Sequence, residues 1–129
     1  MLVFAWKDGK VLVCDIEDRG WCVPSGRVEA GEESMEAAER EALEEGGALL
    51  QDVQYMGCYR ITERREVRWA DCFVASIKEL QEFEITVESL GRKLVTLEEL
   101  PEMYHLWNPL TEMVFQHSLE IVERARKLR

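Results

Sequence analysis

The sequence predicts an α/β or α+β fold in which a mixed β-sheet packs between helices. Three observations predict this class: several short β-branched and aromatic runs, one helical segment among them, and an amphipathic helix at the end of the chain. The order of elements is therefore strands, helix, strands, helix. The 129 residues are 47% apolar and 33% charged, which suits one domain with a buried core.

The chain begins with three expected strands. Residues 2–6 and 10–16 form a hairpin, because the Asp8-Gly9 dipeptide between them suits a type I′ turn. Residues 20–26 form a short strand that runs into a loop at its Pro-Ser-Gly end. This loop leads toward the first expected helix.

That helix is expected over residues 34–45. Ser34 is the expected N-cap, because its hydroxyl can accept a hydrogen bond from a free backbone amide of the first turn. Gly46 and Gly47 provide the C-terminal stop, where glycine readily adopts the left-handed conformation that ends a helix.

The second half of the chain returns to strands and closes with helical segments. In chain order, three strands, a short helical turn and a long helix are expected at residues 53–62, 66–77, 92–97, 98–103 and 110–128. A polar turn, residues 63–65, joins the first two of these strands. Apolar residues recur at helical spacing in the last segment, which makes it amphipathic.

Composition excludes several classes of protein. The net charge of −10 argues against a nucleic-acid polymer as the main partner, because phosphate backbones bind basic surfaces. No apolar run approaches the roughly 20 residues of a membrane span, and the first residues are charged too soon for a signal peptide. We therefore expect a cytoplasmic protein with no membrane partner. A small phosphorylated substrate remains compatible, provided that a cation mediates its binding.

Four cysteines stand singly in apolar, strand-like segments. They are Cys14, Cys22, Cys58 and Cys72. No Cys-x-x-Cys pair appears, so a zinc site is not expected. We expect reduced thiols in the core, as in a cytosolic protein.

The expected helix at 34–45 carries a cluster of acidic residues. Glu41, Glu44 and Glu45 fall on one side at about 100° per residue, and each like-charged pair costs roughly 0.2–0.5 kcal/mol. Two interpretations are open: a solvated acidic face, or hard oxygen ligands for Mg²⁺ or Mn²⁺. The glycine-rich loop before the helix, with Gly26 and Gly31, favours a ligand site because backbone groups can approach a ligand closely there.

These features together resemble the signature of the Nudix hydrolase family. The signature spans residues 26–48, and its fixed positions are Gly26, Glu32, Arg40, Glu41, Glu44, Glu45 and Gly47. Ala42 and Ala48 occupy apolar positions where larger aliphatic residues are common in the family, and Ser25 replaces the first glycine of the usual Pro-Gly-Gly lead-in. The resemblance implies a single Nudix domain over residues 1–129, folded as an α/β/α sandwich.

The resemblance also implies a reaction. Members of the family hydrolyse a nucleoside diphosphate linked to another moiety, using Mg²⁺ or Mn²⁺ to activate the water that attacks phosphorus. The chain is MutT-like in being compact, so the default substrate is a (deoxy)nucleoside triphosphate, cleaved to the monophosphate and pyrophosphate. The alternatives are an ADP-ribose, nucleotide-sugar or dinucleoside polyphosphate hydrolase, and a non-catalytic nucleotide-binding module. Because many members are dimers, a homodimer also stays open.

By this resemblance, roles can be assigned to the signature residues. The implied metal ligands are Glu41, Glu44, Glu45 and the backbone carbonyl of Gly26. Some members add a glutamate from a distant loop; Glu88 is the candidate here, and the alternative is an ordinary exposed loop charge. Glu44, or else Glu41, takes the proton of the attacking water. Arg40 orients the glutamates, and Glu32 ties the loop to Arg40.

The substrate pocket is less clearly marked. Arg60, Arg64, Arg65 and Arg68 are candidates for phosphate contacts, although they also suit a solvated hairpin tip. Tyr59 and Trp69 are candidates for stacking on a base, although aromatic residues in strands are more often core residues. Asn108 resembles the base-contacting asparagine of the MutT branch, and its position before a helix also suits a helix cap.

Overall fold

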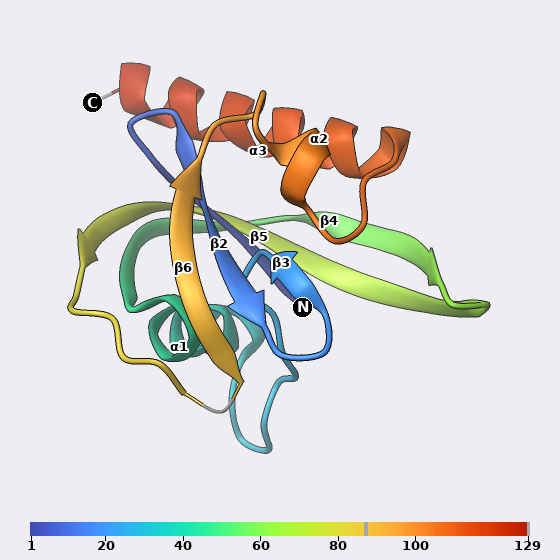
Figure 1. The fold of residues 1–129 in the computed structure, drawn as a ribbon. Coiled ribbons are helices and arrows are strands. Elements are labelled where there is room, and N and C mark those ends of the chain that lie inside the picture. The colour runs from blue at the N-terminus through green and yellow to red at the C-terminus, as the bar shows by residue number, and fades with distance from the viewer. Residues whose placement is uncertain (87, 129) are drawn as a thin grey trace.

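A computed structural model, which describes residues 1–86 and 88–128, shows a mixed six-stranded sheet between helices (Figure 1). The strands are β1 (Leu2–Lys7), β2 (Lys10–Ile16), β3 (Gly20–Cys22), β4 (Ala48–Glu63), β5 (Glu66–Leu80) and β6 (Ser89–Val95). The helices are α1 (Ser34–Gly46), α2 (Leu100–Met103) and α3 (Pro109–Lys127). The predicted fold class is therefore confirmed. None of the helices in these two ranges is long and apolar enough to cross a membrane.

The sheet is mixed because one of its pairings is parallel. Its main order is β3-β2-β1-β5-β4, with β6 paired to β2, and β1 runs parallel to β5 while the other pairs are antiparallel. The loop after β3 runs alongside the start of β1: Val3 donates a backbone hydrogen bond to the Pro24 carbonyl at 2.9 Å, and Leu2 bridges to Ser25. The start of the signature loop is thus fixed to the sheet.

The two faces of the sheet support two cores. In β1, Phe4 and Trp6 face α3, and Trp6 donates a hydrogen bond to the buried Ser118 hydroxyl at 2.8 Å. The alternate residues Val3 and Ala5 belong to the second core, on the α1 side. This alternation makes the sheet the middle layer of a sandwich (Figure 1).

Helix α1 lies close to the sheet because its inner face is made of small residues. Ala37, Ala38 and Ala42 are all fully buried. Gly46, at the end of the same helix, lies over β2, where an added β-carbon would come within 2.6 Å of the Leu12 side chain. Small residues therefore set how near the acidic side of α1 can lie to the preceding loop.

Of the predictions for the two ends of α1, one is wrong and one is confirmed. The expected N-cap is wrong by one position: Glu33 is the N-cap residue, without a side-chain capping bond, and Ser34 is already helical. The extended backbone of Glu33, with ψ 155°, marks where the loop turns into the helix. The C-terminal stop is confirmed, since Gly47 is left-handed with φ 62° and its amide bonds to the Leu43 carbonyl at 2.9 Å.

Strands β4 and β5 form a hairpin that extends beyond the rest of the sheet (Figure 1). β4 begins at Ala48, before the predicted residue 53, because register shifts and a positive φ of 55° at Asp52 let polar residues remain within the strand. Cys58 is exposed on this hairpin, which corrects the expectation that all four cysteines are core thiols. The other three are buried.

Overpacking the contact between α1 and the sheet should destabilise the protein. Ala38→Leu inserts a larger side chain into a fully buried position and should lower the free energy of unfolding by about 1–3 kcal/mol. Urea denaturation followed by circular dichroism measures this. Leu43→Ala, on the same helix at a position 39% exposed, is the control and should cost less than about 1 kcal/mol. Equal effects for the two variants would contradict the close packing described here.

Candidate functional site

The acidic side of α1 meets the loop that precedes the helix. The Ser25 amide donates hydrogen bonds to both carboxylate oxygens of Glu45, at 3.3 and 3.4 Å. Gly26 comes so close to Glu41 that an added β-carbon would collide with the Glu41 carboxylate. A larger residue would require the Glu41 carboxylate to move, so a glycine at the first signature position keeps the two this close.

Arg40 connects the loop to the helix. Its Nε and Nη2 donate to the two carboxylate oxygens of Glu32 at 2.8 and 3.1 Å, and Nη2 also donates to the Arg27 carbonyl at 3.0 Å. Its Nη1 donates to Glu41 Oε1 at 2.8 Å and to Glu44 Oε2 at 3.2 Å. The hydrogen bonds to Glu32 are the main reason that the pKa of Arg40 is raised, and those from Arg40 lower the pKa of Glu32. One guanidinium thus holds three carboxylates in place.

Glu41 and Glu45 are the two carboxylates that lie deepest in the site. Burial raises the pKa of Glu41, against the opposing effect of Arg40. Burial likewise raises the pKa of Glu45 to about 8; the Ser25 amide opposes this shift, and the neighbouring charge of Glu41 adds to it. Burial and mutual repulsion disfavour the charged forms of these two carboxylates. A cation bound between them would offset that repulsion, so the site favours a cation.

The loop that carries Glu88 reaches the end of α1. Glu88 lines a hollow together with Glu44, Glu45 and Thr86. The neighbouring Ser89 hydroxyl donates to the Glu45 carbonyl at 2.7 Å, which fixes this loop to the helix. The structure therefore brings Glu88 beside the signature glutamates, although their sequence positions are distant.

The donor set suits Mg²⁺ or Mn²⁺, because carboxylate and carbonyl oxygens are the ligands that these hard cations prefer. Among the described residues, however, no three acidic, cysteine or histidine side chains are arranged so that they could already hold a metal ion. Arg40 occupies one oxygen each of Glu41 and Glu44, and the Gly26 carbonyl accepts a hydrogen bond from the Met1 amino group at 2.7 Å. The residues thus fit a divalent cation in chemical kind, while Arg40 and the Met1 amino group hold some of their oxygens in this arrangement.

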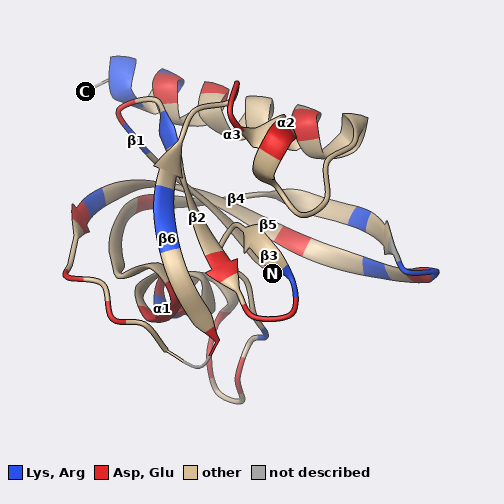
Figure 2. Ribbon diagram, viewed as in Figure 1, with Lys and Arg blue, Asp and Glu red and all other residues tan. Residues whose placement is uncertain are grey.

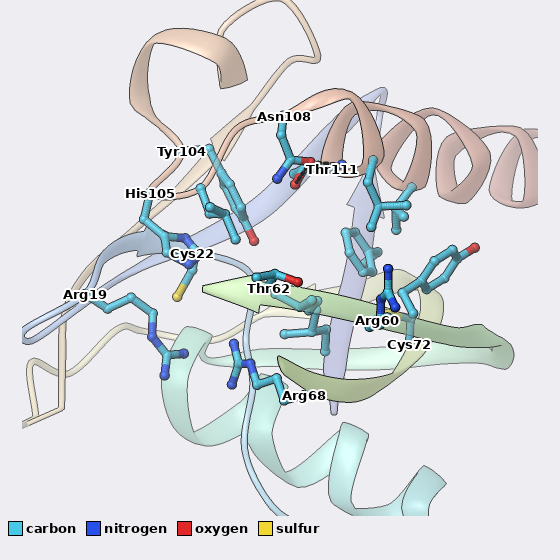
Figure 3. Close-up of a pocket in the computed structure, with 17 residues that line it drawn as sticks. Arg19, Cys22, Arg60, Thr62, Arg68, Cys72, Tyr104, His105, Asn108 and Thr111 are labelled. Atoms are coloured by element: carbon cyan, nitrogen blue, oxygen red, sulfur yellow. Dashed lines mark hydrogen bonds between the residues drawn. The ribbon is translucent and has the colours of Figure 1, made fainter. Parts of the chain in front are cut away.

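A pocket on the α3 side of the sheet contains four of the predicted substrate residues. Tyr59, Arg60, Arg68 and Asn108 all line it, between the β4–β5 hairpin and the start of α3 (Figure 3). Tyr59 packs against the core on the α3 side. The pocket therefore joins residues from both halves of the chain.

Asn108 caps helix α3, which confirms the helix-cap interpretation of this residue. Its side-chain oxygen accepts hydrogen bonds from the Thr111 amide at 2.9 Å and from the Thr111 hydroxyl at 3.1 Å. Because capping uses the oxygen, the side-chain amide nitrogen is the atom that could contact a ligand in the pocket. A capping role and a ligand contact are therefore compatible for this residue.

The other predicted substrate residues lie outside the pocket: Arg64 and Arg65 are at the tip of the hairpin, and Trp69 is on β5 opposite Arg60. Arg64 lines a neighbouring groove, whereas Arg65 and Trp69 line neither that groove nor the pocket. Trp69 is 69% exposed and Val67 is 59% exposed. Side chains alternate along β5, so Arg68 faces the pocket while its two neighbours face the other side of the hairpin.

Arg19 and Tyr104 are among the pocket residues that the sequence did not mark as site residues. Arg19 enters the pocket from the turn between β2 and β3, and Tyr104 enters it from the segment after α2. The Tyr104 hydroxyl accepts a hydrogen bond from the Val23 amide at 3.3 Å, which joins that segment to the signature loop. Neither residue belongs to a periodic pattern or a motif, so only the tertiary structure shows their position.

The sequence and the structure were compared with those of known proteins. The family model for the NUDIX domain matches residues 2–117. A Bacillus subtilis (strain 168) protein with the provisional name 8-oxo-dGTP diphosphatase YtkD is 37% identical over 94 residues. That match covers 73% of this chain and 58% of the relative, so it spans less than two thirds of the relative's length.

Solved structures share the fold. A mutant of the Bacillus subtilis pyrophosphohydrolase BsRppH has a TM-score of 0.74 and 28% identity, over 96% of this chain and 80% of that chain. A NUDIX hydrolase from Nitrosomonas europaea has a TM-score of 0.75 and 20% identity, over 93% and 86% of the two chains. The second likeness bears on the fold alone.

The close approach of Gly26 to Glu41 yields a prediction. Gly26→Ala should displace the Glu41 carboxylate and, if the cluster holds Mn²⁺ as expected, weaken Mn²⁺ binding about tenfold or more in isothermal titration calorimetry. Gly91→Ala is the control, because its β-carbon would lie 3.5 Å from Trp21 Cη2, an ordinary contact. Wild-type Mn²⁺ affinity in a folded Gly26→Ala variant would contradict the expectation.

Proposed function

This chain belongs to the NUDIX family, and from that membership we propose that it is a pyrophosphohydrolase dependent on Mg²⁺ or Mn²⁺. Its substrate is a nucleoside diphosphate linked to another group. Residues 1–129 act as one Nudix domain, and the expected setting is the cytoplasm. The default substrate is a (deoxy)nucleoside triphosphate, which is cleaved to the monophosphate and pyrophosphate.

One observation carries this proposal: Arg40 holds Glu32, Glu41 and Glu44 together, with Gly26 lying directly against Glu41. This is an oxygen-rich site, and Ser25 connects its Glu45 to Arg19, which lines the pocket. A divalent cation, when bound, neutralises phosphate charge and lowers the pKa of bound water. In this proposal Glu41, Glu44, Glu45 and the Gly26 carbonyl hold the cation, with Glu88 as a further ligand.

Glu44 is proposed as the general base, with Glu41 as the alternative. The Glu44 side chain is 58% exposed, whereas that of Glu41 is 12% exposed. Arg40 binds Glu44 through Oε2, so Oε1 can accept a proton from water. Glu41 is enclosed between Arg40 and Gly26, which suits a fixed ligand better than a proton acceptor.

The choice of a nucleoside triphosphate draws on the pocket and on one relative. Tyr59 and Tyr104 give the pocket aromatic walls, and the Asn108 side-chain nitrogen can donate to a base oxygen or ring nitrogen. The provisional name of the Bacillus subtilis relative makes 8-oxo-dGTP the first triphosphate to assay. The other substrates that the resemblance leaves open are ADP-ribose, nucleotide sugars and dinucleoside polyphosphates.

A substrate screen tests this function directly. Canonical nucleoside triphosphates, 8-oxo-dGTP, ADP-ribose, a nucleotide sugar and a dinucleoside tetraphosphate are each incubated with Mg²⁺, Mn²⁺ or EDTA, and products are separated by ion-exchange chromatography. We expect metal-dependent release of a nucleoside monophosphate from at least one triphosphate. Absence of metal-dependent hydrolysis of every substrate would contradict the proposed enzyme.

The role of Glu44 is tested on the substrate that this screen identifies. Glu44→Gln should lower kcat by about 100-fold or more, because the amide cannot accept the proton from water. Glu39→Gln is the matched control, since Glu39 is exposed on the same helix outside the Arg40 network. Wild-type kcat in Glu44→Gln would contradict its role as the base and leave Glu41 as the candidate.

A further inference from the structure

Two arginines from distant parts of the chain lie together at the edge of the pocket. Arg19 is in the turn before β3, and Arg68 is on β5. Both line the pocket of Figure 3 and also the groove beside it. Figure 3 shows their guanidinium groups pointing toward one another. Two positive charges are thus placed where one anion could contact both.

Ser25 holds Arg19 in this position. Arg19 Nη1 donates a hydrogen bond to the Ser25 hydroxyl at 3.2 Å, while the Ser25 amide binds the Glu45 carboxylate. Ser25 occupies the position where the resemblance expects a glycine, which has no side chain to offer Arg19. The departure from the family pattern therefore has a structural consequence in this chain: it connects Arg19 to the acidic cluster.

The arginine pair lies between two parts of the candidate site. On one side are the pocket residues Cys22 and Tyr104, which lie close enough to Arg19 for its charge to act on both. On the other side is Glu45, reached through Ser25. A nucleotide with its base in the pocket and its scissile bond at the carboxylates would pass its phosphates by Arg19 and Arg68.

An anionic substrate needs positive charge along this path. The chain has a net charge of −10, and Figure 2 shows acidic residues on α1 and on the loop before it. Guanidinium groups bind phosphate oxygens through two parallel hydrogen bonds, and they stay charged at any physiological pH. Arg19 and Arg68 can therefore offset the repulsion that the acidic cluster exerts on a polyphosphate.

We propose that Arg19 and Arg68 form a clamp for a substrate phosphate, and that Ser25 is the positioning residue for Arg19. This inference rests on the proposed function and adds to it a phosphate subsite made of side chains, separate from the metal ligands. The clamp favours a nucleotide with a chain of phosphates as the substrate. In such a nucleotide the protein would bind a phosphate beyond those that flank the cleaved bond.

The groove that Arg19 and Arg68 share also contains acidic side chains. It is lined by Glu17, Asp18 and Glu66, together with Arg64. These carboxylates would repel an anion that extended along the groove toward them. The clamp therefore suits the phosphates of a small nucleotide better than a long polyanion.

Binding of inorganic pyrophosphate tests the clamp without catalysis. Isothermal titration calorimetry at low ionic strength, once with Mg²⁺ and once with EDTA, compares wild type with Arg19→Gln and Arg68→Gln. In each condition in which the wild type binds pyrophosphate, each variant should weaken binding about tenfold or more, because a charged hydrogen-bond partner is lost. Arg65→Gln is the matched control and should bind as the wild type does, since Arg65 lines neither the pocket nor the groove.

Wild-type affinity in Arg19→Gln and Arg68→Gln would overturn the clamp, and so would absence of pyrophosphate binding to the wild type under both conditions. An equal loss in Arg65→Gln would show a general charge effect and would also overturn it. These outcomes do not depend on hydrolysis. A clamp that binds pyrophosphate in a protein that hydrolyses no nucleotide would contradict the proposed function alone.

The role of Ser25 needs a readout that a loss of folding would not imitate. Ser25→Ala removes the hydroxyl, and Ser25→Thr retains it, while the amide bond to Glu45 is available in both. We expect Ser25→Ala to raise KM for the hydrolysed nucleotide about threefold or more with kcat nearly unchanged, since the hydroxyl that accepts the hydrogen bond from the Arg19 guanidinium is lost. Ser25→Thr should restore KM. An unchanged KM in Ser25→Ala would remove Ser25 from the proposal.

Discussion

The acidic site depends on the guanidinium group of Arg40. Five hydrogen bonds join it to Glu32, Glu41, Glu44 and the Arg27 carbonyl, so it links the glycine-rich loop to helix α1. Without this charge, the glutamates would repel one another on a single helix side. Arg40 thus makes an acidic cluster tolerable in the absence of a cation, and it holds the cluster in the place where we propose that a cation binds.

The rest of the fold positions this cluster. Pairing of the Pro24–Gly26 segment with the start of β1 fixes the loop, and the small residues of α1 let the helix lie close to the sheet. The hairpin of β4 and β5 and the start of α3 then form a pocket on the other side of the loop. A nucleotide site in this protein would therefore have three parts: an oxygen-rich end, an arginine pair and an aromatic pocket.

Sequence reasoning worked where the determinants are local. Helical spacing brought Glu41, Glu44 and Glu45 to one side, and the turn and stop residues defined the first hairpin and the end of α1. It failed where long-range packing decides: the length of β4, the exposure of Cys58, and the entry of Arg19 and Tyr104 into the pocket. The position of Glu88 beside the cluster was anticipated only through the family resemblance.

The central claim is that the carboxylates braced by Arg40 form a divalent-cation site. The most direct measurement is anomalous X-ray diffraction from crystals of the protein grown with Mn²⁺. The account predicts an anomalous peak within coordination distance of carboxylate oxygens from at least two of Glu41, Glu44 and Glu45. A peak found only elsewhere on the molecule, or no peak at this cluster at saturating Mn²⁺, would contradict it.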